Sequence, residues 1–291
     1  MHDRFNGKST NREPSVLPQS FFIIMQPLIS SNQNPRLKSL VKLRDAKHRR
    51  QQGRFLIDGI REISHACRGG VAIEEIWFDI DRIDGTEFIE THLSPQQLVA
   101  VTLQPVTAEV LAKIEYGERR EGVVAVAKTP NLKLTNLILP VDPLIVVLDR
   151  VEKPGNIGAV CRTAAAANIS ALILSECLCD VFNPNAIRSS LGHLFSLPIA
   201  VASAAETISF LHQNKIAIKV ARVQAEQHHW NTDLRSATAI VLGSEAAGLE
   251  KDWLSPALTG IKIPMDPRVD SLNVSVSAAI LMYEAMRQRS G

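Results

Sequence analysis

The chain has little of what redox, metal-dependent or nucleophilic enzymes usually show in their sequences. It has four cysteines among 291 residues, and none forms a C-x-x-C pair, so neither a disulfide framework nor a zinc site is expected. It has no G-x-G-x-x-G turn, no G-x-x-x-x-G-K-[ST] loop, no G-x-S-x-G elbow and no H-E-x-x-H pair. These absences argue against a P-loop NTPase, a serine hydrolase and a zinc protease, and they predict a protein without a bound metal.

Long hydrophobic runs are also missing. No apolar stretch approaches the ~20 residues of a membrane helix. The hydrophobic content of 45% and charged content of 21% are those of an ordinary globular protein. We therefore expect a cytoplasmic protein without a membrane partner, and the length suggests two domains. Residues 1–27 scatter Asn, Arg, Pro, Ser and Gln without a period, which predicts a disordered tail.

The net positive charge is small, but cations are concentrated in one segment. The formal net charge is +2, yet the segment from Pro35 to Phe55 holds eight Lys or Arg against the single acid Asp45. Its leucines recur at helical spacing, which predicts one helix with an apolar stripe and a basic face. Such a face indicates a polyphosphate partner such as RNA, although a solvated helix or one lying on a membrane surface has the same charge. The cations expected to contact RNA are Arg36, Lys38, Lys42, Arg44, Arg49 and Arg50.

Two units with a proline-rich connection follow the tail. Residues 28–130 alternate short strands and helices, and we expect a small α/β domain there. Residues 131–143 hold several Pro and Asn and suit a linker. Residues 144–291 alternate apolar strands with helices, the last helix running over 272–289 with Ser271 as its N-cap. This alternation predicts a mostly parallel sheet with helices on both faces, whose ligands bind beyond the carboxyl ends of the strands.

Three junctions that follow predicted strands carry Gly, Pro or Asn beside polar side chains. They are 154–158 with the arginine at 162, then 242–248, then 263–265 with 271–275. None holds a strong nucleophile, so these residues are positioning groups. A reaction whose electrophile is supplied by a bound cofactor, such as methyl transfer from S-adenosyl-L-methionine, needs little more. A nicotinamide site, with Glu176 as its ribose-binding acid, is the weaker alternative.

The order of these motifs resembles a known family. The chain carries four motifs in this order: Asn156-x-Gly158-x-x-x-Arg162-Thr163, then Asn183-Pro184-x-x-x-Arg188-x-Ser190-x-Gly192-x-x-Phe195-x-x-Pro198, then Leu242-Gly243-Ser244-Glu245-x-x-Gly248, and finally Ile263-Pro264-Met265 with Ser271-Leu272-Asn273-Val274-Ser275. Together they resemble the motifs of the SpoU (TrmH) branch of the SPOUT methyltransferases. The resemblance covers residues 144–291, and the first unit is similar to the RNA substrate-binding domain of related ribosomal-RNA enzymes.

The resemblance implies an α/β fold with a deep C-terminal trefoil knot, S-adenosyl-L-methionine as cofactor, a homodimer, and 2′-O-ribose methylation of structured RNA. Ribosomal (23S) RNA is the expected substrate, and the alternatives are transfer RNA or a non-catalytic RNA-binding or assembly factor on the same fold. Arg162 would act at the acceptor 2′-hydroxyl, and since an arginine pKa exceeds ~12 it would stabilise charge or bind phosphate rather than take the proton. The residues carried over are, for catalysis, Asn156, Arg162, Ser271, Asn273 and Glu245; for the cofactor, Leu242, Gly243, Ile263, Met265 and Leu272; and for RNA, Arg188.

Overall fold

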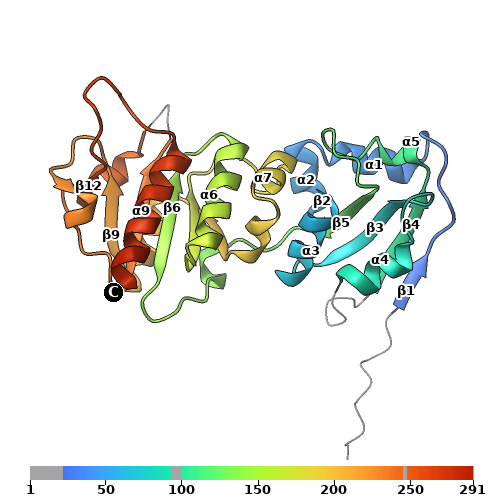
Figure 1. The fold of residues 1–291 in the computed structure, drawn as a ribbon, viewed down its shortest axis with the longest axis horizontal. Helices are drawn as coiled ribbons and strands as arrows, with labels where there is room; N and C mark the ends of the chain where they lie inside the picture. Colours follow the sequence, from blue (N-terminus) through green and yellow to red (C-terminus); the bar gives the residue numbers. More distant parts are fainter. Residues whose placement is uncertain (1–21, 94–99, 245–247, 291) are drawn as a thin grey trace, which may run out of the picture.

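Two β-sheets lie end to end along the long axis of the molecule (Figure 1). The computed structural model describes residues 22–93, 100–244 and 248–290. Five strands form the first sheet and seven form the second. This is the expected α/β fold, with a small unit ahead of a parallel one. None of the described helices has the length and apolar character needed to cross a membrane.

The first sheet is mixed. Its order is β1-β4-β3-β5-β2, in which β4 runs parallel to β1 and β3, and β5 runs antiparallel to β3 and β2. Its elements are β1 (Phe22–Met25), α1 (Pro35–Lys42), α2 (Ala46–Gln52), β2 (Arg54–Asp58), α3 (Ile60–Arg68), β3 (Ile73–Asp79), α4 (Gly85–His92), β4 (Ala100–Val106), α5 (Ala108–Leu111) and β5 (Val123–Lys128).

Two expectations about this unit were wrong. The tail was expected to reach residue 27, but the apolar run that forms β1 pairs with β4 and satisfies main-chain groups at that sheet edge. Residues 1–21 lie outside the described chain. The basic segment forms two helices rather than one, because the Asp45 side chain accepts the N–H of Lys47 at 2.7 Å and so begins α2. The lone acid of the run is the residue that divides it.

The second sheet is parallel throughout, in the order β10-β12-β9-β11-β6-β7-β8. Its elements are β6 (Leu144–Asp149), α6 (Pro154–Ala166), β7 (Ala171–Ser175), α7 (Pro184–Ser189), η3 (His193–Ser196), β8 (Ile199–Ala202), α8 (Ala204–Gln213), β9 (Ala217–Ala221), β10 (Gln227–His228), η4 (His229–Asn231), β11 (Thr238–Gly243), η5 (Lys251–Leu254), β12 (Thr259–Lys262) and α9 (Val274–Arg289).

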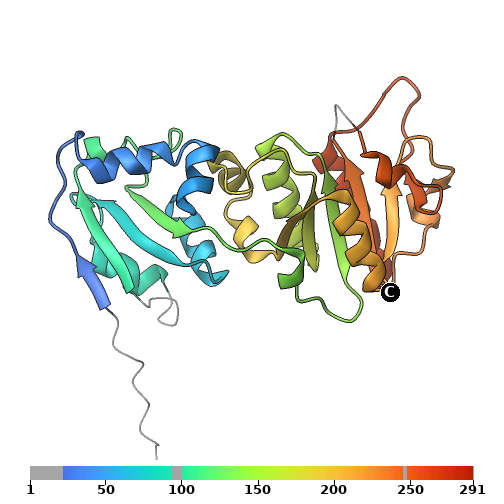
Figure 2. The same cartoon turned by 180° about the vertical axis from the view of Figure 1, so that it is seen from behind.

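The strand β6 is buried on both faces, as its unbroken apolar run predicted. Val146 and Leu148 join the core beneath α6 and α9, whereas Ile145 and Val147 join the core beneath α8 and η5. Figure 2 shows α8, in gold, across the second of these faces. The segment expected to be a linker contains a short helix, η2 (Leu134–Asn136). Leu134, Leu137 and Leu139 of this segment pack against that same core.

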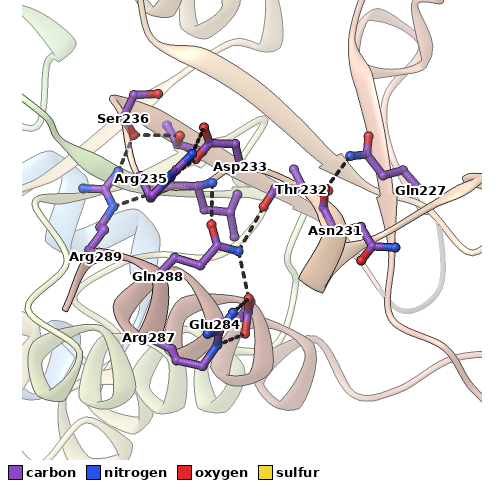
Figure 3. A network of polar contacts seen from close by, with 12 residues as sticks. Gln227, Asn231, Thr232, Asp233, Arg235, Ser236, Glu284, Arg287, Gln288 and Arg289 are labelled. Atoms are coloured by element: carbon purple, nitrogen blue, oxygen red, sulfur yellow. Dashed lines mark hydrogen bonds and ion pairs between the residues drawn. The ribbon is translucent and has the colours of Figure 1, made fainter. Parts of the chain in front are cut away.

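The C-terminal end of α9 is fixed to the loop that precedes β11 (Figure 3). The Gln288 side chain accepts the N–H of Leu234 at 2.9 Å and donates to the carbonyl of Thr232 at 3.0 Å. Arg289 donates to the carbonyls of Leu234 and Asp142 at 2.8 and 2.7 Å. These bonds fix α9 across the sheet, so its N-terminal end is held over the opposite edge, where the strands end.

The two units share a continuous core where they meet. Phe55 of β2 stacks on Phe182, which precedes α7, with ring centroids 4.3 Å apart. Beside this stack Arg49 of α2 forms an ion pair with Asp180 at 2.6 Å, and only 4% of the Arg49 side chain is exposed. A buried ion pair and an aromatic stack across the junction hold the first unit in a defined position on the second.

Candidate active site

A cavity of about 420 Å³ lies beyond the carboxyl ends of the adjacent strands β12, β9 and β11. This is the edge of a parallel sheet at which ligands were expected to bind. The cavity is walled by the segments that follow these three strands and by the first turn of α9. Its lining residues are Ala221, Arg222, Val223, Gln224, Leu242, Gly243, Ser244, Gly248, Leu249, Leu254, Ile261, Ile263, Met265, Ser271, Leu272, Val274 and Ser277.

All five residues predicted to bind the cofactor line this one cavity, and so does Ser271. Sequence reasoning missed the wall that Arg222 and Gln224 form after β9. The signal was weak because nothing in the sequence says that β9 lies between β11 and β12. Arg222 is held in this wall by donating to the carbonyl of Trp253 at 2.7 Å.

Gly243 is required by a close approach of the chain to itself. A Cβ atom at this position would lie 2.6 Å from the carbonyl carbon of Gly248. Ser244 and Gly248 exchange main-chain hydrogen bonds of 3.1 Å in both directions, and Gly248 has a φ of +65°. The loop after β11 therefore returns tightly on itself at the cavity wall. Glu245 lies outside the described residues.

Asn156 and Asn273 meet although 117 residues separate them. The Nδ2 of Asn273 donates to Oδ1 of Asn156 at 3.3 Å, while Oδ1 of Asn273 accepts the N–H of Ser275 at 2.9 Å. Asn273 is therefore the N-cap of α9, and the expectation that Ser271 has this role was wrong. Since Leu272 and Val274 on either side line the cavity, the asparagine pair lies at its margin.

Arg162 lies farther along α6 and is exposed to solvent. Six residues separate it from Asn156, which on a helix is about 9 Å along the axis and roughly a third of a turn in angle. It does not line the cavity, and no hydrogen bond or ion pair to it is found among the described residues. The structure therefore brings Asn156 and Asn273 together and places Ser271 in the cavity wall, whereas within the described part of the chain the guanidinium of Arg162 has no hydrogen-bond or ion-pair partner.

A buried carboxylate that the sequence did not indicate supports this edge of the sheet. Asp149, at the end of β6, accepts the hydroxyl of Ser175 at 2.8 Å and the N–H of Glu250 at 2.7 Å. The Glu250 carboxylate in turn pairs with Arg150 at 3.0 Å. These contacts fix the chain that re-enters the fold after the Gly248 turn.

Two further motif residues have structural roles. Gly158 lets α6 approach α7, because a Cβ there would lie 1.9 Å from the Ser189 hydroxyl and 2.5 Å from the carbonyl of Ala186. Glu176 accepts the N–H of Ala204, the first residue of α8, at 2.9 Å, while Ser203 is the N-cap of that helix. The Glu176 carboxylate is engaged there, which removes the main support for a nicotinamide site. In the described part of the chain, no group of three or more His, Cys, Asp or Glu is placed to hold a metal ion.

Comparison with known proteins agrees with this geometry. Residues 143–283 match the model of the SpoU rRNA Methylase family, and residues 34–125 match the MRM3-like substrate binding domain. The chain is 32% identical over 250 residues to a 23S rRNA (uridine(2479)-2′-O)-methyltransferase of Streptomyces viridochromogenes, covering 83% of this chain and 85% of the relative. It is 30% identical over 262 residues to an uncharacterised tRNA/rRNA methyltransferase of Synechocystis, covering 90% and 94%.

The chain belongs to the SpoU rRNA methylase family. Solved structures support the same assignment. An RNA 2′-O ribose methyltransferase is 38% identical with a TM-score of 0.75, covering 91% of this chain and all of the other. The SpoU methyltransferase AviRb from Streptomyces viridochromogenes, in complex with AdoMet, is 28% identical with a TM-score of 0.80, covering 89% and 99%.

The cations expected to contact RNA in this SpoU protein divide into two groups. Lys38, Lys42, Arg44 and Arg50 are exposed on and between α1 and α2. Arg49 is buried in its ion pair with Asp180, so the expectation that it contacts RNA was wrong. Exposure does not exclude a partner, since Lys38 donates to Gln33 and Arg44 to the carbonyl of Glu115, each at 2.6 Å. The remaining two cations are also engaged within the protein. Arg36 pairs with Glu75 at 2.8 Å and lies over the ring of Trp77, and Arg188 donates to the main chain of the first unit at Tyr116.

Proposed function

We propose that this SpoU-family protein transfers a methyl group from S-adenosyl-L-methionine to a ribose 2′-hydroxyl of 23S ribosomal RNA in the cytoplasm. The observation that carries the proposal is the cavity beyond β12, β9 and β11 with the Asn156–Asn273 pair at its margin. Relatives named as 23S rRNA 2′-O-methyltransferases cover most of the chain, which favours ribosomal over transfer RNA.

The residues present fit the proposed cofactor. A volume of about 420 Å³ lies in the range of small-molecule pockets, and such pockets combine apolar walls with a few main-chain polar groups. Leu242, Ile263 and Leu272 supply apolar surface, and Gly243 allows the main chain to approach a ligand closely. When bound, the cofactor supplies an electrophilic methyl group on a sulfonium. The protein must then bind it, align the acceptor and stabilise the developing charge.

Asn156, Ser271 and Asn273 would orient the acceptor ribose, since their amide and hydroxyl groups lie at the cavity margin. Arg162 would bind the acceptor phosphate or stabilise the developing alkoxide. A guanidinium does not lose its proton near neutral pH, so the hydroxyl proton leaves to another acceptor.

We also propose that the protein acts as a homodimer with a knotted second unit, residues 144–291. Val276 and Tyr283, one heptad apart on α9, are 48% and 46% exposed, and such apolar exposure on one helix face is typical of an interface. An Arg162 that is outside the cavity of its own chain would act in the cavity of the partner. Residues 28–130 would be the RNA substrate-binding domain and 131–143 the connection.

Methyl transfer to in-vitro transcribed 23S ribosomal RNA and to transfer RNA tests the proposal. The parent protein should label the 23S transcript, and Arg162→Ala should lower the rate by about 10²–10³-fold, as expected when one charge-stabilising group is removed. Arg162→Lys, which keeps the charge but not the planar fork, should be intermediate. Cofactor affinity, measured by calorimetry, should not change in either variant.

Equal labelling by Arg162→Ala and the parent would remove Arg162 from the mechanism. A parent that binds the cofactor and RNA but labels neither RNA would instead be a non-catalytic RNA-binding or assembly factor. Calorimetry with NADH decides the remaining alternative, because NADH binding without S-adenosyl-L-methionine binding would overturn the proposal.

A further inference from the structure

We propose that Tyr116 is a stacking platform for an unpaired RNA base at the junction of the two units, on the path from the basic helices α1 and α2 to the catalytic cavity. The proposal rests on the proposed function and adds a specific contact to it. Tyr116 lies in the loop between α5 and β5, one residue after Glu115. It is one of only two tyrosines in the chain.

The main chain on both sides of this ring is fixed by side chains from three other segments: β2, α7 and the turn between α1 and α2. The N–H of Tyr116 donates to Asp58 at the end of β2 at 2.7 Å, and its carbonyl accepts from Arg188 of α7. The preceding carbonyl, of Glu115, accepts from Arg44 at 2.6 Å. Such anchoring limits the entropy that the loop loses on binding, so an aromatic side chain here is preorganised.

Tyr116 is 37% exposed as a residue. On its inner side Tyr116 lines a cleft of about 20 Å³ between the units together with Ile114, Pro184 and Ile187. That volume is too small for a nucleobase, so a base would stack on the outer face. Base–aromatic stacking tolerates any base and is a general means of holding unpaired RNA.

Cations surround the platform. Arg119 and Arg120 follow it in the same loop and are exposed. Arg44 and Arg188 each donate one hydrogen bond to the loop, and no other side-chain hydrogen bond from either guanidinium is found among the described residues. Their remaining N–H groups can therefore donate to phosphate oxygens. The acids near the ring are Asp58, Glu115, Glu118 and Glu121, of which Glu118 alone is exposed. Since Arg44, Arg119 and Arg120 are all exposed, the accessible charge around the ring is mainly positive, which favours a phosphate backbone over an acidic partner.

The platform also lies on a continuous path to the catalytic cavity. Arg188 belongs to α7, and α7 packs on α6 so closely that Asn185 lies 3.8 Å from a Cβ placed at Gly155. Asn156 is the next residue and meets Asn273 at the cavity. In Figure 1, α1, α2 and α7 lie along the same upper edge as the beginning of α6. An RNA strand along this edge would contact the basic helices, Tyr116 and the catalytic residues in turn.

The test compares Tyr116→Ala, Tyr116→Leu and Tyr116→Phe in the full-length protein. The substrate is in-vitro transcribed 23S ribosomal RNA, and KM for RNA, kcat and cofactor affinity are measured. We expect KM to rise about tenfold in the Ala and Leu variants, the size of one base–aromatic stack, and to remain at the parental value in the Phe variant. Leucine retains apolar bulk against Pro184 and Ile187, so a rise in KM in the Leu variant would not come from a packing defect. kcat and cofactor affinity should not change.

A parental KM in Tyr116→Ala, or a Phe variant as weak as Ala, would overturn the stacking role while leaving the proposed function intact. A parent that methylates no RNA overturns the proposed function and, with it, this inference. A rise in KM for Ala but not for Leu would assign Tyr116 to packing between the units and would also overturn it.

Discussion

The sequence predicted the cavity beyond β12, β9 and β11 far better than it predicted the junction between the two units. The cavity is built from short motifs that follow strands, and every residue predicted to bind the cofactor lines it. The junction is built from residues scattered through both units, among them Arg49, Phe55, Asp180 and Phe182, and two of its arginines were assigned to RNA instead. A ligand site at a sheet edge follows from the loops that end the strands of a parallel sheet, whereas a packed junction depends on which surfaces meet.

The same comparison shows that basic residues in one segment can have two different roles, one in packing and one at the surface. In α2, Arg49 and Arg50 are neighbours in the sequence, yet one is buried in an ion pair across the junction and the other is exposed. Charge density along the chain indicates an RNA partner but does not say which cations remain free to contact it.

The largest change in the free energy of unfolding should come from replacing Arg49 by leucine. This change leaves Asp180 without its partner and removes the donor to the carbonyls of Leu43 and Arg44. Breaking a buried ion pair typically costs about 3–5 kcal/mol. Urea unfolding should show a loss in this range, with Arg50→Leu as the matched control near zero. An Arg49→Leu protein as stable as the control would show that the junction does not depend on this ion pair.

A smaller loss of stability should follow from adding one methyl group where α6 packs against α7. In Gly158→Ala the new Cβ would lie 1.9 Å from the Ser189 hydroxyl, so the two helices must separate, at a cost of about 1–3 kcal/mol. Gly155→Ala is the control in the same helix, because its Cβ would meet only Asn185 at 3.8 Å. Thermal unfolding of both variants checks the contrast, and equal melting temperatures would contradict it.

Much of the fold could be predicted because, in the second unit, the spacing of apolar residues along the sequence agrees with the residues that the structure buries. The unbroken apolar run of β6 predicted a strand covered on both faces, and the Asn273 segment was placed correctly at a helix start. Three features could not be predicted. Ser271 and Asn273 are both good N-caps, so only the geometry distinguishes them. Asp45 was interpreted as a single acid within a basic helix rather than as the residue that begins a second helix. The Arg222 wall depends on β9 lying between β11 and β12, which is a property of chain topology.

The junction should also make stability depend on pH. Burial raises the pKa of the Asp58 carboxyl from 3.8 to about 7, against the hydrogen bond from Tyr116 and the nearby Arg188, and with the acids Glu115 and Glu121 adding to the rise. The folded state therefore holds a proton that the unfolded chain has lost above pH 4. It follows that the free energy of unfolding falls as pH rises from about 4 to 7.

Asp58→Asn removes this titration while keeping an acceptor for the Tyr116 N–H. The variant should therefore gain on the parent in stability between pH 5 and pH 8. The gain should be on the order of 1 kcal/mol, since water screens a site that is only partly buried. Urea midpoints measured across this range provide the check. A constant difference between the two proteins at every pH would mean that Asp58 is ionised in the folded state throughout.

The smallest effect distinguishes free cations from paired ones on the basic helices. Lys42 is exposed, and no ion pair to it is found among the described residues, whereas Arg36 is engaged with Glu75 and Trp77. Each cation that neutralises a phosphate contributes roughly 0.7–0.9 to the slope of log affinity against log salt. Lys42→Gln should reduce that slope by about this amount and leave stability unchanged. Arg36→Gln should leave the slope unchanged and lower stability, because the charge of Arg36 is already balanced by Glu75. Filter binding of 23S transcripts from 50 to 200 mM salt measures both slopes. If the two variants lost slope equally, the ion pair would not decide which cations meet RNA, and the contrast between the junction and the RNA-contacting surface would have to be drawn elsewhere.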